Sequence, residues 1–275
     1  MNRIDAKFRA LKKQGEAALI PFVTAGDPDM ATSLKILRAL EAGGADAIEL
    51  GVPFSDPMAD GATIQRASER ALRGGATLPR VLEMVRKFRR QSNVPVILFG
   101  YYNPIFRYGL KRFVRAAAAA GVDGVLCVDL PPEESGELGR HAAKAGLETI
   151  FLLAPTSDAE RIRLVARKGS GFIYYVSVTG VTGARRQLED RLQSQVERIR
   201  RYSRLPVGVG FGISRPEHAA RVASFADAAV VGSALIAALE KTPGKADKPK
   251  QAAAFVARLK RAMKQVHKKG LSNKD

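Results

Sequence analysis

Three carboxylates fall within one short passage of the chain, and this passage predicts a reactive site. Glu49 lies in an apolar run, 47–50, and Asp56 and Asp60 follow in a segment rich in Pro, Ser and Gly. A charged residue near the end of a buried strand is costly unless it is paired or functional. Two separated carboxylates suit a reaction that needs one group as an acid and another as a base or charge stabiliser. The structural alternative is that Asp56 and Asp60 cap turns and Glu49 pairs with an arginine.

Two glycine-containing turns later in the chain predict a binding site for an anion. They span 208–214 and 230–234, and each follows an apolar run and precedes a predicted helix. Glycine lets the backbone approach an anion closely, and the N–H groups at a helix start donate hydrogen bonds to it. The spacing of Gly210 and Gly212 lacks the dinucleotide-binding pattern, which disfavours a dinucleotide. The alternative is that these glycines serve close packing or plain turns.

A third segment, 178–186, combines small residues, spaced glycines and two arginines. This composition suits a loop that closes over a substrate, with an arginine in reach of a phosphate. An ordinary surface loop is the alternative.

Other kinds of catalytic centre find little support in the residues. The histidines are scattered over predicted helices without the spacing of metal ligands, so no metal site is expected; they are His141, His218 and His267. Neither a Gly-x-Ser-x-Gly motif nor a Cys/His pairing points to covalent catalysis. The single cysteine, Cys127, lies in an apolar run, and we expect it to be a buried packing residue rather than a reactive thiol.

Short apolar runs alternate with amphipathic segments over nearly the whole chain. The expected strands are 17–23, 47–50, 94–101, 125–128, 149–153, 172–178, 206–209 and 228–231. Continuous apolar strands between helices indicate a parallel sheet covered on both faces. Eight strand–helix units in 275 residues predict an α/β fold, a closed (β/α)8 TIM barrel. A doubly wound open sheet is the structural alternative.

The sequence also predicts helices outside the simple repeat. They are an N-terminal helix at 4–13 and short helices after strands two and eight, at 64–72 and 233–240. Asp27 and Pro28 together look like an N-cap and first helical residue of the helix after strand one. No low-complexity linker divides the chain. We therefore expect one domain over 1–275, in which 241–275 forms a basic loop and a C-terminal helix.

A barrel of this kind brings the candidate groups together. Its reacting groups lie at the carboxyl ends of the strands and in the loops that follow, and phosphate often binds after strands seven and eight. Glu49 ends the expected second strand, Asp60 follows it, and the two glycine turns follow strands seven and eight.

The net charge of +18 is high, and residues 241–275 hold eleven Lys or Arg against two Asp. We interpret this segment as a helix with a solvated basic face. Basic stripes also bind nucleic acid, but no aromatic-interleaved basic motif or recognition-helix pattern accompanies them, so nucleic acid is not an expected partner. No apolar run approaches the ~20 residues of a membrane helix, and the polar start lacks the apolar core of a signal peptide. We expect a cytoplasmic protein without membrane association.

Several of these segments are specific enough to indicate a family. They lie at 21–28, 49–61, 102–104, 129–134, 177–183 and 210–214. In this order they resemble the tryptophan synthase alpha subunit family, and the resemblance runs over nearly the whole chain. It implies a lyase that cleaves indole-3-glycerol phosphate to indole and glyceraldehyde 3-phosphate by a retro-aldol reaction.

The resemblance also implies roles for individual residues. Glu49 would be the acid/base, and Asp60 the partner of the indole N–H. The phosphate would rest on Gly212, Gly232 and Ser233. The indole and glycerol pocket would be lined by Phe22, Thr24, Tyr101, Tyr174 and Phe211, with Tyr174 preferred to Tyr175 by its register from Ser177. The closing loop would include Thr182 and Gly183, and Asp56 and Pro57 would lie in a loop that faces a partner subunit.

That partner would be a β subunit that uses pyridoxal phosphate to convert indole and serine to tryptophan. The resemblance implies an α2β2 tetramer with an internal indole tunnel, allosteric coupling through the loops at 53–60 and 179–187, and no cofactor in this chain. The strongly basic balance is not part of the family pattern. Three rival functions stay open: an indole producer without a β partner, a phosphosugar isomerase on the same barrel, and a basic barrel that binds phosphorylated ligands or nucleic acid without catalysis.

Overall fold

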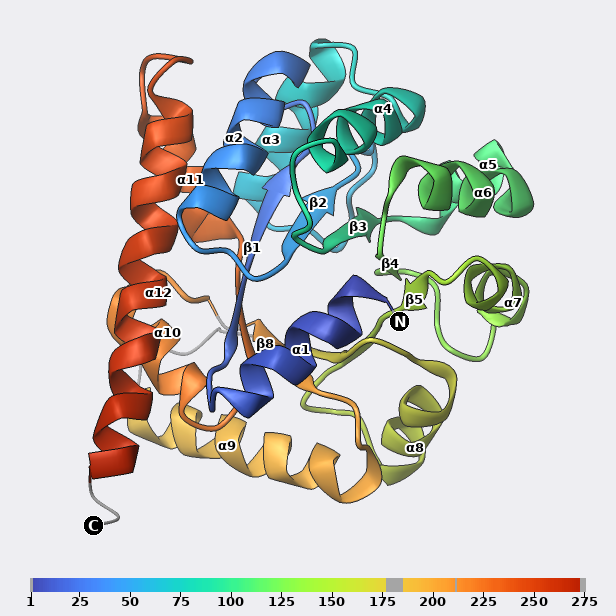
Figure 1. Ribbon diagram of the computed structural model, residues 1–275. Helices are drawn as coiled ribbons and strands as arrows, with labels where there is room; N and C mark the ends of the chain where they lie inside the picture. Colours follow the sequence, from blue (N-terminus) through green and yellow to red (C-terminus); the bar gives the residue numbers. More distant parts are fainter. Residues whose placement is uncertain (1, 177–184, 211, 273–275) are drawn as a thin grey trace.

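Parallel strands close into a barrel at the centre of the molecule (Figure 1). The computed structural model describes residues 2–176, 185–210 and 212–272. The strand segments are β1 (Ala18–Thr24), β2 (Ile48–Gly51), β3 (Val96–Gly100), β4 (Gly124–Cys127), β5 (Glu148–Thr149), β6 (Phe151–Leu153), β7 (Ile173–Val176), β8 (Val207–Gly210) and β9 (Ala228–Val231). Their order in the sheet is β5-β4-β3-β2-β1-β9-β8-β7-β6, and neighbouring strands in this order pair in parallel throughout the described residues.

The barrel closes within a single strand of the chain. β5 pairs with β4 on one side, and β6 pairs with β7 on the other. The two segments are separated by Ile150 alone, whose backbone N–H donates to the Val125 carbonyl oxygen at 2.9 Å. β5 and β6 are therefore halves of the expected fifth strand, and the sheet is an eight-stranded closed barrel. The predicted TIM barrel is confirmed, and the open-sheet alternative is wrong.

Helices surround the strands on the outside (Figure 1). They are α1 (Arg3–Lys13), α2 (Met30–Ala42), α3 (Ala62–Arg73), α4 (Leu78–Arg89), α5 (Tyr102–Tyr108), α6 (Leu110–Ala120), α7 (Gly136–Lys144), α8 (Ala159–Lys168), α9 (Arg185–Tyr202), α10 (Pro216–Ala223), α11 (Ser233–Lys241) and α12 (Lys248–Ser272). The predicted extra helices before β1, after β2 and after β9 correspond to α1, α3 and α11. The short helix α5 was not predicted, because its Tyr-Asn-Pro start resembles a turn.

The start of α2 differs from the prediction. The N-cap is Asp29, whose carboxylate accepts the Thr32 backbone N–H at 2.8 Å. Asp27 and Pro28 precede the helix and are joined by a cis peptide bond. The carboxylate of Asp27 is engaged elsewhere, in an ion pair with Arg70 at 2.8 Å. Asp27 therefore ties two elements together instead of capping a helix.

The alternation of side chains along each strand divides the core into two layers. Inward-facing residues such as Ile20, Ala47 and Ile97 form an inner cluster. Apolar residues of α1, including Phe8, pack into that cluster and close the amino-terminal end of the barrel. Outward-facing residues pack against the surrounding helices in a larger cluster. Glu49 lies two residues after Ala47, so its side chain also points into the barrel.

Three aspartates pin the amino-terminal ends of the strands. Asp46, Asp123 and Asp227 accept the backbone N–H groups of neighbouring chain segments at 2.8, 2.8 and 2.9 Å; the donors are Leu19, Val96 and Val207. Each of the three also pairs with a cation from an outer helix: Lys260 at 2.8 Å, Arg89 at 2.8 Å and Arg200 at 3.0 Å. These contacts lie at the end of the barrel opposite the expected site, so we infer that they stabilise the fold and take no part in catalysis.

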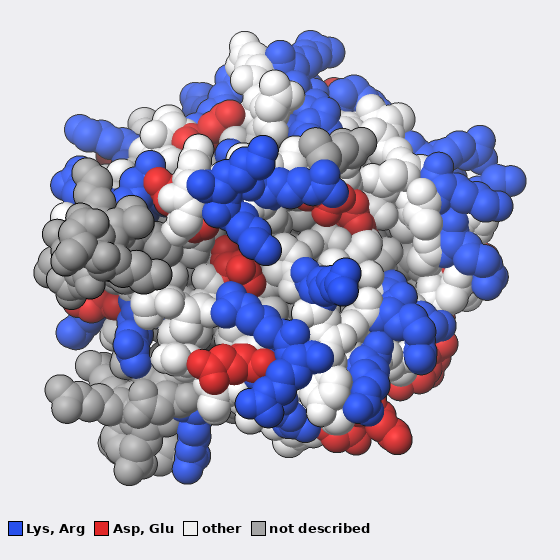
Figure 2. All heavy atoms as spheres, turned by 60° about the horizontal axis from the view of Figure 1, so that its bottom comes forward, with Lys and Arg blue, Asp and Glu red and all other residues white. Residues whose placement is uncertain are grey.

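The positive charge is not confined to the C-terminal segment. Lys and Arg side chains cover much of the face in Figure 2, with Asp and Glu interspersed among them. Cations also pair with acids in several places, such as Arg161 with Glu133 at 2.6 Å. None of the described helices is long and apolar enough to cross a membrane.

Candidate active site

Glu49 is a carboxyl group inside the barrel, and it has no partner within the described ranges of the chain. Glu49 lies on β2 beside Phe22 of β1, and the whole residue is only 1% exposed to solvent. Neither of its carboxylate oxygens has a hydrogen-bond partner among the described residues. Burial raises the pKa of Glu49 to about 8, because the charged form loses its hydration. The group is therefore mostly protonated at neutral pH and can donate a proton. The arginine pair considered from the sequence is not found in the part of the chain that the structure describes.

Glu49 opens onto a cavity of about 450 Å³ at the carboxyl ends of the strands. Its other described lining residues are Phe22, Ile64, Phe99, Tyr174, Gly210, Gly212, Ile213, Ser214, Val230, Gly232, Ser233 and Ala234. The Phe22 and Phe99 rings meet edge to face with centroids 5.2 Å apart, and Tyr174 lies 6.4 Å from Phe99. The cavity thus combines an aromatic wall with a polar end made of glycine and serine backbone, and it suits a flat ring linked to an anion.

Two glycines make room for the aromatic wall. A Cβ atom on Gly51 would lie 2.6 Å from Cζ of Phe22, and a Cβ on Gly210 would lie 2.8 Å from Cε1 of Tyr174. Both distances are too short for real contacts, so each ring occupies space that a side chain would fill. Gly210 therefore shapes the ring pocket as well as belonging to a turn of the anion end, whereas Gly51 shapes the ring pocket from β2.

The polar end of the cavity is built from backbone at the ends of β8 and β9. Gly212 has a φ of +43°, a left-handed conformation that glycine adopts without strain. Gly232 is the N-cap of α11, and Ser233 is its first residue. The lining residues that the structure describes include no Lys or Arg. Among the described residues, an anion would therefore be held by the free N–H groups and the positive dipole end of α11.

Asp60 lies in the loop between β2 and α3, outside the set of residues that line the cavity. Tyr101 holds this loop, because its hydroxyl accepts the Ala59 backbone N–H at 2.9 Å. Gln65 donates to the Asp60 carbonyl oxygen at 2.8 Å. Burial raises the pKa of Asp60, and a hydrogen bond with the Tyr101 side chain opposes that shift. Burial also raises the pKa of Tyr101 to about 12.

The remaining predicted residues fall in different places. Thr24 is buried on β1 opposite Gly51, and its hydroxyl has no partner among the described residues, yet it does not line the cavity. Tyr174 lines the cavity, whereas Tyr175 packs into the outer core layer. Phe211, Thr182 and Gly183 lie outside the described residues.

Two lining residues were missed in the sequence. Phe99 is two residues before Tyr101 on the expected third strand, so the two-residue period of a strand places both on the inward face. That signal could have identified Phe99. Ile64 comes from the first turn of α3, and its place on the cavity depends on how α3 packs against the barrel.

Asp56 is separate from this group of residues. It is exposed and accepts a hydrogen bond from the Ser55 hydroxyl, and Met58 nearby is 87% exposed. The described residues contain no cluster of three or more His, Cys, Asp or Glu able to hold a metal ion. The single thiol, Cys127, is buried, and burial raises its pKa to about 12, which agrees with a packing role.

Known proteins match both the sequence and the fold. Residues 8–268 match the family model described as Tryptophan synthase alpha chain. The chain is 60% identical over 245 residues to the tryptophan synthase alpha chain of Geotalea daltonii, which covers 89% of this chain and 93% of that one. It is 57% identical over 266 residues to the corresponding chain of Geotalea uraniireducens, covering 97% and 99%.

Solved structures show the same barrel. Tryptophan synthase subunit alpha from Legionella pneumophila superposes with a TM-score of 0.90 at 42% identity, over 96% of this chain and 99% of that one. A chain of Mycobacterium tuberculosis tryptophan synthase superposes with a TM-score of 0.87 at 37% identity, over 95% and 98% of the two chains.

Proposed function

Because the chain belongs to the tryptophan synthase alpha chain family, we propose that the cavity at Glu49 is where it cleaves indole-3-glycerol phosphate. The chain is a carbon–carbon lyase of tryptophan biosynthesis, and its products are indole and glyceraldehyde 3-phosphate. The observation that carries the assignment is the buried carboxyl of Glu49, unpaired among the described residues, in a cavity with aromatic walls and a helix N-terminus at one end.

Glu49 supplies the proton that the cleavage needs. The proton goes to the indole ring carbon that bears the glycerol chain, and a base removes the proton of the adjacent glycerol hydroxyl. The bond between the protonated ring carbon and the carbon that bears this hydroxyl then breaks. Its electron pair returns to the ring, and the hydroxyl-bearing carbon becomes the aldehyde. A carboxyl with a pKa of about 8 is protonated at neutral pH and becomes a base once it has given up its proton.

Asp60 stabilises the positive charge that develops on the ring nitrogen, by accepting a hydrogen bond from the indole N–H. Its loop position supports this role, since Ile64, four residues further on in α3, lines the cavity. The contact of Tyr101 with the loop keeps the carboxylate near the mouth of the barrel.

Gly212, Gly232 and Ser233 hold the phosphate, and the aromatic wall holds the indole ring. Phe22 and Tyr174 of that wall are the predicted pocket residues that line the cavity. Thr24, Tyr101 and Phe211 complete the pocket in this proposal, and Thr182 and Gly183 belong to the loop that closes over the substrate. Binding the phosphate at one end and the ring at the other places the reacting carbons beside Glu49.

The chain works with a tryptophan synthase β subunit in an α2β2 tetramer. Pyridoxal phosphate resides in the β subunit, so the cleavage step uses side chains of this chain alone. The loop holds the exposed Asp56 and Met58 on either side of the half-buried Pro57, which supports a place in the partner contact. We also propose that residues 1–275 form one domain, with 241–275 as part of it, and that the protein acts in the cytoplasm.

The test is an assay of indole release from indole-3-glycerol phosphate, with and without a β subunit. The parent protein should release indole, and Glu49→Gln should lower turnover by about 10²–10⁴-fold, since a general acid contributes that much. Glu49→Gln keeps the shape of the side chain, so ligand binding should persist. Asp60→Asn should also lower turnover strongly, though less than Glu49→Gln.

Asp56→Asn is the matched control, because it changes the same residue type four positions from Asp60 on exposed surface. The turnover of Asp56→Asn should match that of the parent when no β subunit is present. Near-normal turnover of Glu49→Gln would refute the proton-donor role, and parental turnover of Asp60→Asn would refute the contact with the indole N–H.

A further inference from the structure

Helices α3 and α11 pack against each other beside the cavity. Ala67 of α3 and Ile236 of α11 form a small apolar cluster with Phe22 of β1, and Ile64 packs against it. Both helices reach the cavity with their first turns, through Ile64 in α3 and Ser233 in α11. The loop that carries Asp60 leads directly into α3. The pair therefore joins the Asp60 loop to the anion end of the cavity.

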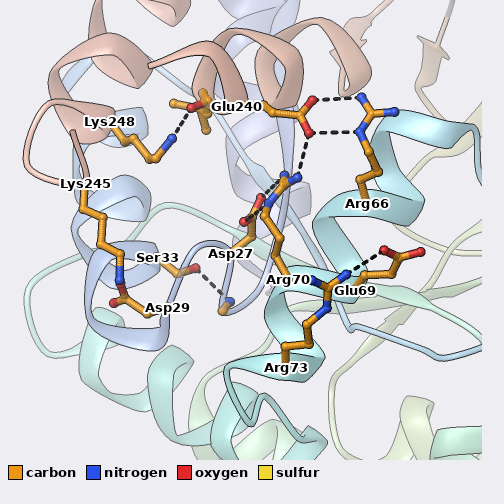
Figure 3. A network of polar contacts seen from close by, with 12 residues as sticks. Asp27, Asp29, Ser33, Arg66, Glu69, Arg70, Arg73, Glu240, Lys245 and Lys248 are labelled. Carbon is orange, nitrogen blue, oxygen red and sulfur yellow. Dashed lines mark hydrogen bonds and ion pairs between the residues drawn. The ribbon is translucent and has the colours of Figure 1, made fainter. Parts of the chain in front are cut away.

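Ion pairs join the C-terminal end of α11 to α3 (Figure 3). Glu240, near the end of α11, accepts two hydrogen bonds from Arg66 of α3: Nε to Oε1 at 2.9 Å and Nη2 to Oε2 at 2.8 Å. Arg70, one turn further along α3, donates from Nη1 to Oε1 of the same carboxylate at 2.7 Å. Hydrogen bonds from Arg66 are the largest of the causes that lower the pKa of Glu240, which is about 2, so the carboxylate stays charged at neutral pH.

Arg70 also reaches a third element. Its Nε donates to Oδ1 of Asp27 at 2.8 Å and its Nη2 donates to Oδ2 at 2.9 Å, a bidentate pair. Asp27 follows β1, the strand that carries Phe22 and Thr24. The Arg70 and Asp27 side chains are 30% and 14% exposed, so the pair is partly shielded from solvent. Figure 3 shows the Arg70 guanidinium between the two carboxylates.

The C-terminal end of α11 is held a second time, by α12. The Lys248 ammonium donates to the Thr242 carbonyl oxygen at 2.8 Å and to the carbonyl oxygen of Leu239. These contacts satisfy carbonyl groups that a helix end leaves free, and they place positive charge at the negative end of the helix dipole. α11 is thus fixed along its far end, away from the anion site.

We propose that Arg70 is a positioning residue, which through Asp27 and Glu240 sets the distance between the phosphate-binding start of α11, the Asp60 loop and the aromatic wall. The proposal rests on the function proposed above, because it concerns the same substrate. It adds a residue that touches neither substrate nor reacting atoms. Arg70 acts from behind the site, where it joins the β1 end, α3 and α11.

The geometry explains why such a link matters. The substrate is tethered at its phosphate and at its ring, and the reacting carbons lie between these two points. A displacement of about 1 Å between binding groups lowers a rate by up to about 10²-fold, because reacting groups lose their alignment. An element that keeps α11 in register with α3 and β1 therefore protects both phosphate affinity and turnover.

The experiment compares Arg70→Gln with Arg73→Gln in the full chain. Arg73 lies on the same helix and pairs with Glu69 at 3.1 Å, but these side chains are 77% and 61% exposed and touch neither Asp27 nor Glu240. Turnover, KM and the dissociation constants of glyceraldehyde 3-phosphate and indole are measured well below the melting temperature of each variant.

Arg70→Gln should raise both KM and the dissociation constant of glyceraldehyde 3-phosphate roughly tenfold, and change that of indole by less than about twofold. Arg73→Gln should match the parent in turnover, in KM and in the dissociation constants of both ligands. Arg70→Lys should recover little, because an ammonium cannot form the bidentate pair with Asp27 while bonding Glu240. In a double-mutant cycle, Glu240→Gln should weaken phosphate binding in the parent and have a smaller effect in Arg70→Gln.

The outcomes separate the two proposals. Arg70→Gln could lower the melting temperature and yet keep the parental KM for the substrate and the parental dissociation constant of glyceraldehyde 3-phosphate. In that case Arg70 has only a structural role and the inference is wrong. If the parent releases no indole, the proposed function fails instead. Binding of glyceraldehyde 3-phosphate to Arg70→Gln and to the parent would still decide the positioning role.

Discussion

Glu49 and Tyr174 face the same cavity from β2 and β7, and the charge of Glu49 acts on the acidity of the Tyr174 hydroxyl. Burial raises the pKa of Tyr174 well above its usual value, and the charge of Glu49 adds to that shift. Tyr174 therefore stays neutral throughout the useful pH range. Glu49, with a pKa of about 8, is the group of this pair that titrates near neutrality.

The rate of cleavage should follow the protonation of Glu49. The protonated carboxyl is the proton donor, so kcat/KM should be steady below pH 8 and fall about tenfold per pH unit above it. This parameter reports ionisations of the free enzyme, which is the state described here. A pH profile of indole release between pH 6 and pH 10 is the measurement. A profile that is flat to pH 10 would show that the proton donor is another group.

The stability of the fold should also depend on Glu49. Its folded-state pKa is raised from 4.5 to about 8, so between these values the folded state binds a proton that the unfolded state has released. The stability due to Glu49 is thus fully present below pH 4.5 and is lost as the pH rises to about 8, a loss of roughly 3–5 kcal/mol.

Glu49→Gln lacks this titration. Relative to the parent, the variant should become progressively more stable between pH 5 and pH 8.5, as measured by denaturant unfolding. A stability difference that stays constant over this range would mean that the Glu49 pKa is not raised.

Gly210→Ala should weaken ring binding. The new methyl group would lie 2.8 Å from Cε1 of Tyr174, so the ring must move and narrow the cavity. We expect indole affinity and turnover to fall by about tenfold or more, since overpacking costs about 1–3 kcal/mol. Gly139→Ala in α7 is the control, because nothing lies within 4 Å of its added Cβ. That variant should keep parental activity, and an equal loss in both would refute the steric argument.

Gly212→Val should weaken phosphate-bearing ligands more than free indole. A β-branched residue is strained at a φ of +43° and shifts the backbone at the anion end of the cavity. The affinity for glyceraldehyde 3-phosphate should fall by about tenfold or more, because strain of this kind costs of order 1–3 kcal/mol. Gly15→Val carries similar strain at a φ of +67°, in a turn after α1 at the other end of the barrel. Calorimetry with indole and with glyceraldehyde 3-phosphate distinguishes the two variants. Equal weakening of indole binding and glyceraldehyde 3-phosphate binding by Gly212→Val would argue against the phosphate site.

Much of the fold could be predicted because its signals are local. The apolar strands at 47–50, 125–128 and 228–231 alternate with helical periods, which indicates a parallel sheet, and eight such units in this length predicted a barrel. The carboxyl-end rule then placed Glu49 and the two glycine turns at one end of it. Asp27 was misassigned as a helix cap because a side chain's partner, here Arg70 43 positions away, leaves no trace in the adjacent residues.

By itself, the sequence determined the order of the elements, the position of Glu49 at the end of the second strand and the family to which the chain is similar. These follow from short apolar runs, from the period of helices and from short motifs, all of which are contiguous along the chain. Only the tertiary structure decided that Glu49 has no partner among the described residues, that Phe99 and Ile64 join the cavity, and that Arg70 connects α3 with α11 and the end of β1. Burial, and with it the raised pKa of Glu49, depends on atoms brought together from strands far apart in the chain, which is why packing had to decide it.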